Sequence, residues 1–88
     1  MTMEDRPLFK YRWPTFRMTV YGGYIDLWER RGLLSQEETI MISEVTAVGV
    51  SRTGRLQLTT RDGAARNLTV GTKAKKAKAA ILQAMRAR

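Results

Sequence analysis

Apolar and polar residues alternate along most of the chain, and the period of this alternation changes near residue 72. Between residues 16 and 70 the apolar positions recur every second residue in short segments, which is the period of half-buried β-strands. The segments that fit this period cover residues 16–20, 24–30, 39–43, 45–51, 55–61 and 68–70. From residue 73 to about residue 87, alanine and lysine dominate and the apolar side chains fall on one helical stripe. The pattern predicts a β-rich antiparallel roll or barrel of six or seven strands, capped by one C-terminal helix.

Turn residues separate the expected strands. Glycine marks three tight turns, at Gly22-Gly23, Thr53-Gly54 and Asp62-Gly63. We expect Asp62-Gly63 to form a type I′ turn, in which both central residues have positive φ. We expect residues 30–37 to form a polar connection in which Leu33 and Leu34 pack down on the edge of the core. Thr72 is of a residue type that caps helices, and we expect it to begin the C-terminal helix.

Residues 1–15 are predicted to form an N-terminal extended arm or edge strand, and residues 16–88 a single domain. Aromatic and basic residues alternate over residues 9–13, and Pro7 and Pro14 bracket this segment, which restricts it to a sheet edge. Its aromatic face either packs on its own domain, closes a dimer or contacts a partner. Trp28 lies opposite the core-facing residues of its own strand and also needs a cover. The candidate protein-contact residues are Phe9, Tyr11, Trp13 and Trp28.

The order of the elements resembles the small bacterial pleckstrin-homology-like domains. The resemblance is clearest over residues 39–82, where a strand, two glycine turns, two further strands and a helix follow one another. The segments that carry it are Ile40-Met41-Ile42, Val45-Thr46-Ala47-Val48, Gly54, Leu56-Gln57-Leu58 and Asp62-Gly63. It implies a seven-stranded barrel, with residues 9–13 as the seventh strand, and an interaction module that binds lipid headgroups, peptides or other domains. It transfers no ligand residues, because the turn at Gly22-Gly23 lacks the basic motif of the lipid-binding members.

The net charge of +8 is concentrated in the second half of the chain. Residues 1–44 carry a net charge of −1 and residues 45–88 a net charge of +9, with Asp62 as the single acid of the second half. This asymmetry favours a partner with negative charge, such as phosphate, an acidic protein or anionic lipid, although a solvated basic surface would show the same composition. Lysines beside free N–H groups at a helix N-terminus also favour an anion site. The candidate anion- and partner-binding residues are Lys73, Lys75, Lys76, Lys78, Arg52, Arg55, Arg61 and Arg66.

Several kinds of chemistry find no support in the sequence. The chain has no histidine and no cysteine, which removes the commonest general base and the commonest metal ligands. No nucleophile–base pair, P-loop or dinucleotide fingerprint is present, so we expect neither an enzyme nor a cofactor or metal site. No apolar run is long enough to span a membrane, and residues 1–5 do not resemble a signal peptide, so we expect a cytoplasmic protein.

These observations predict a non-enzymatic binding module that recognises an anionic or protein partner, either a phosphate-bearing headgroup or an acidic peptide surface. An anionic membrane surface belongs to the same class of partner. The alternative is a nucleic-acid-binding module that uses the basic C-terminal half; the aromatic residues lie away from that half in the sequence, so this interpretation requires the fold to bring them together. The third interpretation is a structural homo-oligomer subunit, because a small sheet leaves strand edges free to pair.

Overall fold

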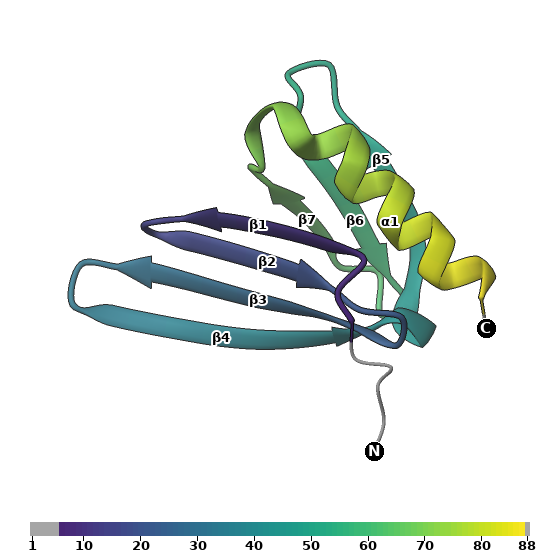
Figure 1. Cartoon of the computed structure of the whole chain (residues 1–88), viewed down its shortest axis with the longest axis horizontal. Coiled ribbons are helices and arrows are strands. Elements are labelled where there is room, and N and C mark those ends of the chain that lie inside the picture. The colour runs from purple at the N-terminus through teal and green to yellow at the C-terminus, as the bar shows by residue number, and fades with distance from the viewer. Residues whose placement is uncertain (1–5, 88) are drawn as a thin grey trace.

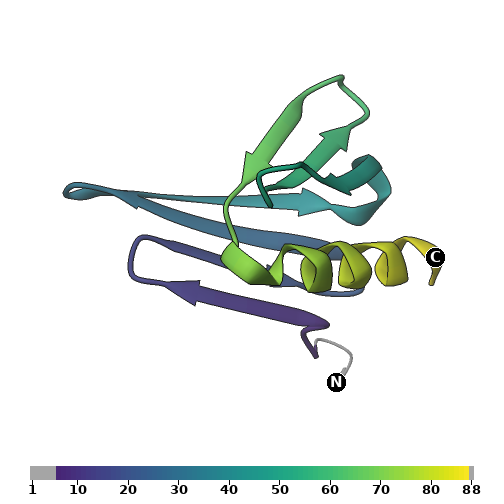
Figure 2. The ribbon, with the colours of Figure 1, turned by 90° about the horizontal axis from the view of Figure 1, so that it is seen from above.

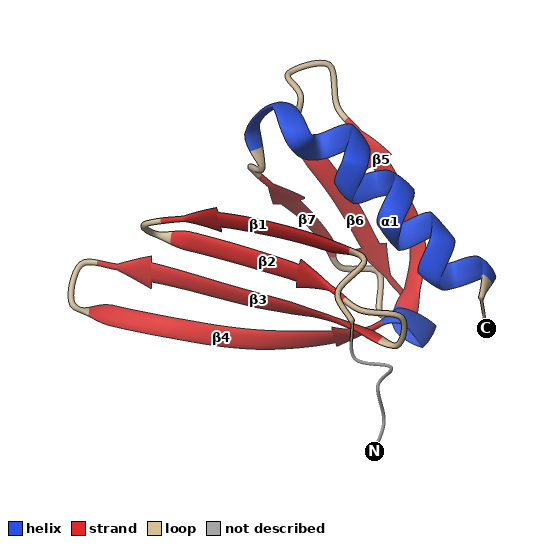
Figure 3. Cartoon of the chain, in the orientation of Figure 1, coloured by secondary structure: helices blue, strands red, loops and turns tan. Residues whose placement is uncertain are grey.

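The structure is a computed structural model that describes residues 6–87; the prediction about a signal peptide concerns residues 1–5 and lies outside them. Seven antiparallel strands form two sheets, and one C-terminal helix packs on them (Figures 1 and 3). The first sheet contains β1 (Phe9–Trp13), β2 (Phe16–Val20), β3 (Tyr24–Arg31) and β4 (Leu34–Met41). The short 3-10 helix η1 (Ile42–Glu44) leads to the second sheet, which contains β5 (Val45–Val50), β6 (Leu56–Thr60) and β7 (Ala65–Leu68). The 3-10 helix η2 (Gly71–Lys73) then precedes the helix α1 (Ala74–Arg86).

The prediction of a β-rich antiparallel fold with a terminal helix is confirmed. Over residues 6–87 the strands do not close into a barrel, because no hydrogen-bonded ladder joins the two sheets. The segment expected as an edge strand forms β1, which pairs with β2 from Phe9 opposite Val20 to Trp13 opposite Phe16. The described chain therefore has four outer strands, β1 and β4 in one sheet and β5 and β7 in the other.

The core lies where α1 crosses the space between the two sheets (Figure 2). Alternation places Met18 and Ile25 on the inner face of the first sheet, and both are fully buried. Leu58 of β6 is likewise fully buried, and Ile81 of α1 completes the cluster. The rest of the buried helix stripe consists of alanines, whose small side chains let the helix backbone approach the strands closely: Ala74, Ala77, Ala80 and Ala84.

The prediction of a polar connection over residues 30–37 is wrong. These residues continue β3 and begin β4 as a hairpin, with Arg31 paired to Leu34 and a two-residue turn between them. Gly32 has a φ of +60° and the following leucine does not, which is the pattern of a type II′ turn. Leu33 and Leu34 are 96% and 76% exposed, so neither packs on the core edge. The reason is the length of the hairpin, whose tip extends past the second sheet to a place that no other described segment covers (Figures 1 and 2).

The hairpin at Asp62-Gly63 exists, but its turn is not type I′. Only Gly63 has positive φ, at +87°, and its N–H donates to the carbonyl of Thr60 at 2.9 Å. This geometry is a type I turn followed by a glycine bulge. The Asp62 carboxylate explains why this turn forms instead of a type I′ turn. It accepts hydrogen bonds from the Thr60 hydroxyl at 2.5 Å and from the Ala64 N–H at 3.0 Å. Both bonds lower the pKa of Asp62, and the bond from the Thr60 hydroxyl has the larger effect.

The start of the helix also differs from the prediction. Thr72 lies inside η2 and does not cap α1, which begins at Ala74. Lys73 occupies the N-cap position and makes no side-chain cap hydrogen bond. The helix begins late because the chain turns at Gly71. The φ of Gly71, +59°, redirects the backbone between the buried Val70 and the helix.

The outer strand β4 carries two adjacent acids near its centre. Glu37 pairs with Trp28 on the outer face of the sheet, and Glu38 pairs with Leu27 on the inner face. Each face of this strand therefore presents one glutamate at mid-length.

Candidate binding cleft between the two sheets

A cleft of about 970 Å³ opens where the two sheets diverge. The end of the β1–β2 hairpin and the end of β3 form one wall. Residues 66–73, which run from β7 through η2, form the other wall. The cleft exists because β1 to β4 extend beyond β7, so the second sheet covers only part of the inner face of the first (Figure 1).

Three aromatic side chains line the first wall. The register of β1 and β2 places Tyr11, Trp13 and Phe16 on the inner face of the sheet, and all three border the cleft. The rings of Tyr11 and Phe16 contact each other with centroids 6.2 Å apart. Trp13 is 59% exposed, which is unusual for so large an apolar side chain and leaves its surface available to a ligand.

Cations outnumber acids around the cleft. Arg31 lies 3.5 Å from Glu29, but both side chains are largely exposed and the pair is weak. Arg30 sits at the rim and donates from Nε to the carbonyl of Gly32 at 3.0 Å, and it forms no ion pair with any residue of the described range 6–87. Among residues 6–87, Lys73 forms no ion pair. The cleft therefore offers uncompensated positive charge next to aromatic surface.

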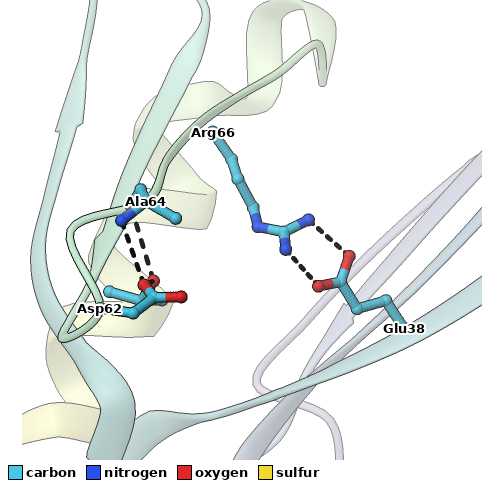
Figure 4. A network of polar contacts seen from close by, with 5 residues as sticks. Glu38, Asp62, Ala64 and Arg66 are labelled. Atoms are coloured by element: carbon cyan, nitrogen blue, oxygen red, sulfur yellow. Dashed lines mark hydrogen bonds and ion pairs between the residues drawn. The ribbon is translucent and has the colours of Figure 1, made fainter.

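The fourth cation, Arg66, links the two sheets. Two N–H groups of its guanidinium donate to the two carboxylate oxygens of Glu38 on β4, so the pair bridges β7 of the second sheet and β4 of the first (Figure 4). Paired hydrogen bonds of this kind fix the geometry of both side chains. Because the charge of Arg66 is matched by Glu38, this residue positions the walls and contributes little net charge to a ligand.

The structure does not gather the predicted basic residues at one place. Lys73 and Arg66 line the cleft, whereas Lys75 and Lys76 are exposed on the first turn of α1. The remaining predicted residues lie elsewhere: Lys78 is half-buried further along α1, Arg52 and Arg55 flank the β5–β6 turn, and Arg61 is in the β6–β7 turn, donating to the carbonyl of Ser43 at 3.0 Å.

The predicted contact residues are also divided. Tyr11 and Trp13 border the cleft, and Phe9 packs against the core. Trp28 lies on the opposite face of the sheet, where the guanidinium of Arg17 stands 4.6 Å from the centre of its ring. This contact, and not the Leu33-Leu34 tip, covers part of Trp28.

Sequence reasoning missed Phe16, Arg30 and Arg31 as cleft residues. A signal for the two arginines was available, because Arg30-Arg31 precedes Gly32-Leu33, and a glycine at the first central position is the signature of a type II′ hairpin. Reading that signature would have placed both arginines at the end of a strand instead of in a loop.

Among residues 6–87 no group of histidine, cysteine, aspartate and glutamate side chains is placed to hold a metal ion, and no polar side-chain atom is buried without a hydrogen bond. Within the same residues, no helix is both long and apolar enough to cross a membrane. What the geometry offers is a cationic and aromatic surface for non-covalent contact.

Comparison with known proteins gave no match. Neither a family model, nor a curated protein, nor a solved structure is similar to this chain. The case for a function therefore rests on the residues of the cleft itself.

Proposed function

We propose that the protein is a non-enzymatic binding module that holds an anionic group of its partner in the cleft between the two sheets. One observation carries the proposal: among the described residues that line the cleft, four are cationic and Glu29 is the single acid, and an exposed tryptophan lies beside them. Clefts lined by one sign of charge concentrate ligands of the opposite sign. An exposed aromatic ring adds apolar contact that an anion alone would not use, so the partner carries both features.

The start of α1 supports the same proposal. The unpaired N–H groups of a helix N-terminus carry partial positive charge, and here neither a side-chain cap nor an acidic residue in the first turn offsets it. Lys73, at the N-cap, also borders the cleft. The positive end of the helix dipole and the lysine charge therefore act on the same ligand.

The finer architecture that we propose is pleckstrin-homology-like. Four strands, then three strands, then one helix is the order that this interpretation requires. Here the divergence of the two sheets would be the binding site instead of a closed barrel mouth.

The test compares two double variants that remove equal charge. Inorganic pyrophosphate and fluorescein-labelled hexaglutamate serve as probes, because they distinguish phosphate from carboxylate as the bound group. We expect Arg31→Ala/Lys73→Ala to weaken binding of the preferred probe about tenfold, since each charged contact contributes roughly 0.5–1 kcal/mol. Lys75→Ala/Lys76→Ala is the matched control, and we expect it to bind as the unmodified chain does. Equal loss in both variants would mean that only net charge matters and would contradict the proposal.

Single-stranded nucleic acid is the second candidate, because the cleft places aromatic residues of the first half beside cations of the second half. Trp13 and Phe16 border the same space as Arg66 and Lys73, although the two pairs lie far apart in the sequence. Stacking platforms beside cations are what single strands require. An oligothymidylate that binds the chain, and loses affinity on Trp13→Ala and steeply with salt, would favour this candidate over an acidic protein.

A further inference from the structure

The second sheet is too narrow to cover the first, and its outer strand β7 lies beside the uncovered part. β7 pairs with β6 on one side and with no described strand on the other. In Figures 1 and 2 the hairpin ends of β1 to β4 extend past β7 on its unpaired side. An additional strand on that side would lie over the exposed inner face of the first sheet.

The backbone of β7 has groups free for such a strand. The N–H of Thr60 donates to the carbonyl of Ala64 at 3.0 Å, and the register continues with Leu58 opposite Arg66. In an antiparallel ladder, bonded and non-bonded pairs alternate, so Arg66 bonds to β6 and the N–H and carbonyl of Asn67 point to the free edge. Asn67 is exposed and borders the cleft.

The floor beneath this edge fits alternate side chains of an extended chain. Trp13, Phe16 and Leu34 lie on the inner face of the first sheet, and Trp13 and Leu34 are mostly exposed. Two hollows open over this floor, the main cleft and a second of about 280 Å³ beside Leu34 and Gln36. Packed sheets lie roughly 10 Å apart, so side chains from a strand added to β7 would fill this space.

We propose that an extended acidic peptide segment of a partner adds to the free edge of β7 as an eighth strand and lies across the cleft. Its backbone pairs with Asn67, its apolar side chains contact Trp13 and Leu34, and its carboxylates meet Arg31 and Lys73. Main-chain pairing supplies affinity and alternate side chains supply specificity, as in other cases of strand addition. Charge complementarity selects an acidic peptide, because the cations of the cleft outnumber its acids. The inference rests on the proposed function for the charge of the ligand, and on the β7 edge for its extended form.

The decisive variant is Asn67→Pro. Proline removes the N–H that points to the free edge, and no hydrogen bond between β7 and β6 is lost. Asn67→Ala is the matched control, because it keeps the N–H and removes only the side chain. The probe is a fluorescein-labelled decapeptide that alternates glutamate with valine, and its binding to the full chain is followed by fluorescence anisotropy. We expect Asn67→Pro to bind the decapeptide about tenfold more weakly than Asn67→Ala does. Circular dichroism during thermal unfolding checks that both variants fold.

A second measurement keeps the inference testable if Asn67→Pro does not fold. The same decapeptide with N-methyl groups on alternate residues retains every side chain but cannot pair along one edge. We expect the unmodified chain to bind this peptide at least about tenfold more weakly than the parent peptide. Equal binding of the two peptides would overturn strand addition, and so would failure of the parent peptide to bind.

The outcomes also separate this inference from the proposed function. Loss of binding in Arg31→Ala/Lys73→Ala, with full binding of the N-methyl peptide, would keep the anion site and reject the strand. Loss in Asn67→Pro, with full binding in Arg31→Ala/Lys73→Ala, would keep the strand and reject the anion site, and with it the acidic partner. If the parent peptide does not bind and Asn67→Pro converts an oligomer of the unmodified chain to a monomer in sedimentation, the occupant is a second copy, and the inference is wrong.

Discussion

The two ends of the first sheet share one pattern of alternation but differ in burial. At the end covered by α1, Met18 and Ile25 are fully buried. At the hairpin end, Trp13 is 59% exposed and Leu34 is 76% exposed, although both lie on the same inner face. The residues at the two ends are similarly apolar, so the difference arises from cover: the second sheet and the helix lie over only one end of the first sheet (Figure 1).

This difference separates the residues that stabilise the fold from those of the binding site that we propose. The covered end contains the apolar cluster that the fold needs, and the hairpin end contributes little to it. Surface that is not required for folding is free to serve a partner. We therefore expect substitutions at the covered end to change the free energy of unfolding more than substitutions at the hairpin end.

The largest contrast is between Leu58→Ala and Leu34→Ala. Leu58 is fully buried against the helix side of the fold, so its truncation leaves a cavity and should lower the free energy of unfolding by about 3 kcal/mol. Leu34 lies largely in solvent, and its truncation should change the free energy of unfolding by less than about 0.5 kcal/mol. Urea denaturation of both variants measures the difference. A comparable loss in Leu34→Ala would show that the hairpin end is buried in solution.

The next prediction concerns the tip of the exposed hairpin. Gly32 has a φ of +60° and free space where a Cβ would lie, so Gly32→Ala introduces backbone strain without a clash. We expect a loss of about 1 kcal/mol in the free energy of unfolding. Gly22→Ala is the matched control, because Gly22 also has free space but lacks positive φ, and it should cost less. Equal effects in thermal unfolding would contradict the type II′ turn.

A smaller effect is expected where Glu38 of β4 and Arg66 of β7 link the two sheets. Glu38 and Arg66 are each about one-third exposed, at 35% and 38%, so solvent weakens their attraction. A double-mutant cycle with Glu38→Ala and Arg66→Ala should give a coupling energy of about 0.5–1 kcal/mol that decreases with added salt. A coupling of zero at low salt would mean that the pair does not hold the walls of the cleft together.

The smallest effect is a dependence of stability on acid at the β6–β7 turn. Hydrogen bonds from Thr60 and Ala64 lower the pKa of Asp62 in the folded chain. A lowered folded pKa means that the carboxylate stabilises the fold above the ordinary aspartate pKa, and that this contribution is lost as the pH falls through the folded pKa. Asp62→Asn should therefore flatten the acid limb of a plot of melting temperature against pH. An unchanged acid limb would show that these bonds do not persist in solution.

Alternation predicts most strands and the helix because one face of each element meets the core, as in β2 and α1. It fails at residues 30–37, where the hairpin leaves the core and both faces are exposed, so no apolar period remains to identify the strand. The type II′ signature at Gly32-Leu33 was the local signal that could replace it.

The sequence predicts some residues of the cleft but not the cleft itself. Lys73 and Arg66 could be selected by charge, but the cleft itself depends on how far one sheet extends beyond the other. Tyr11 and Trp13 meet these cations only through the tertiary arrangement. The position of the second sheet over the first is a property of packing that no local sequence pattern encodes, and this is why the candidate site could be predicted only in part.

The adjacent acids Glu37 and Glu38 of β4 affect whether two copies of the molecule can pair through this strand at high concentration. If two copies aligned these outer strands antiparallel about a twofold axis centred on the strand, Glu37 would oppose its own counterpart, or Glu38 would oppose its own. Because Arg66 neutralises Glu38, the repulsion that opposes pairing of two β4 edges comes mainly from Glu37 on the outer face. β7 has an uncharged residue, Asn67, on its free edge, so the repulsion that opposes self-pairing at β4 is absent there.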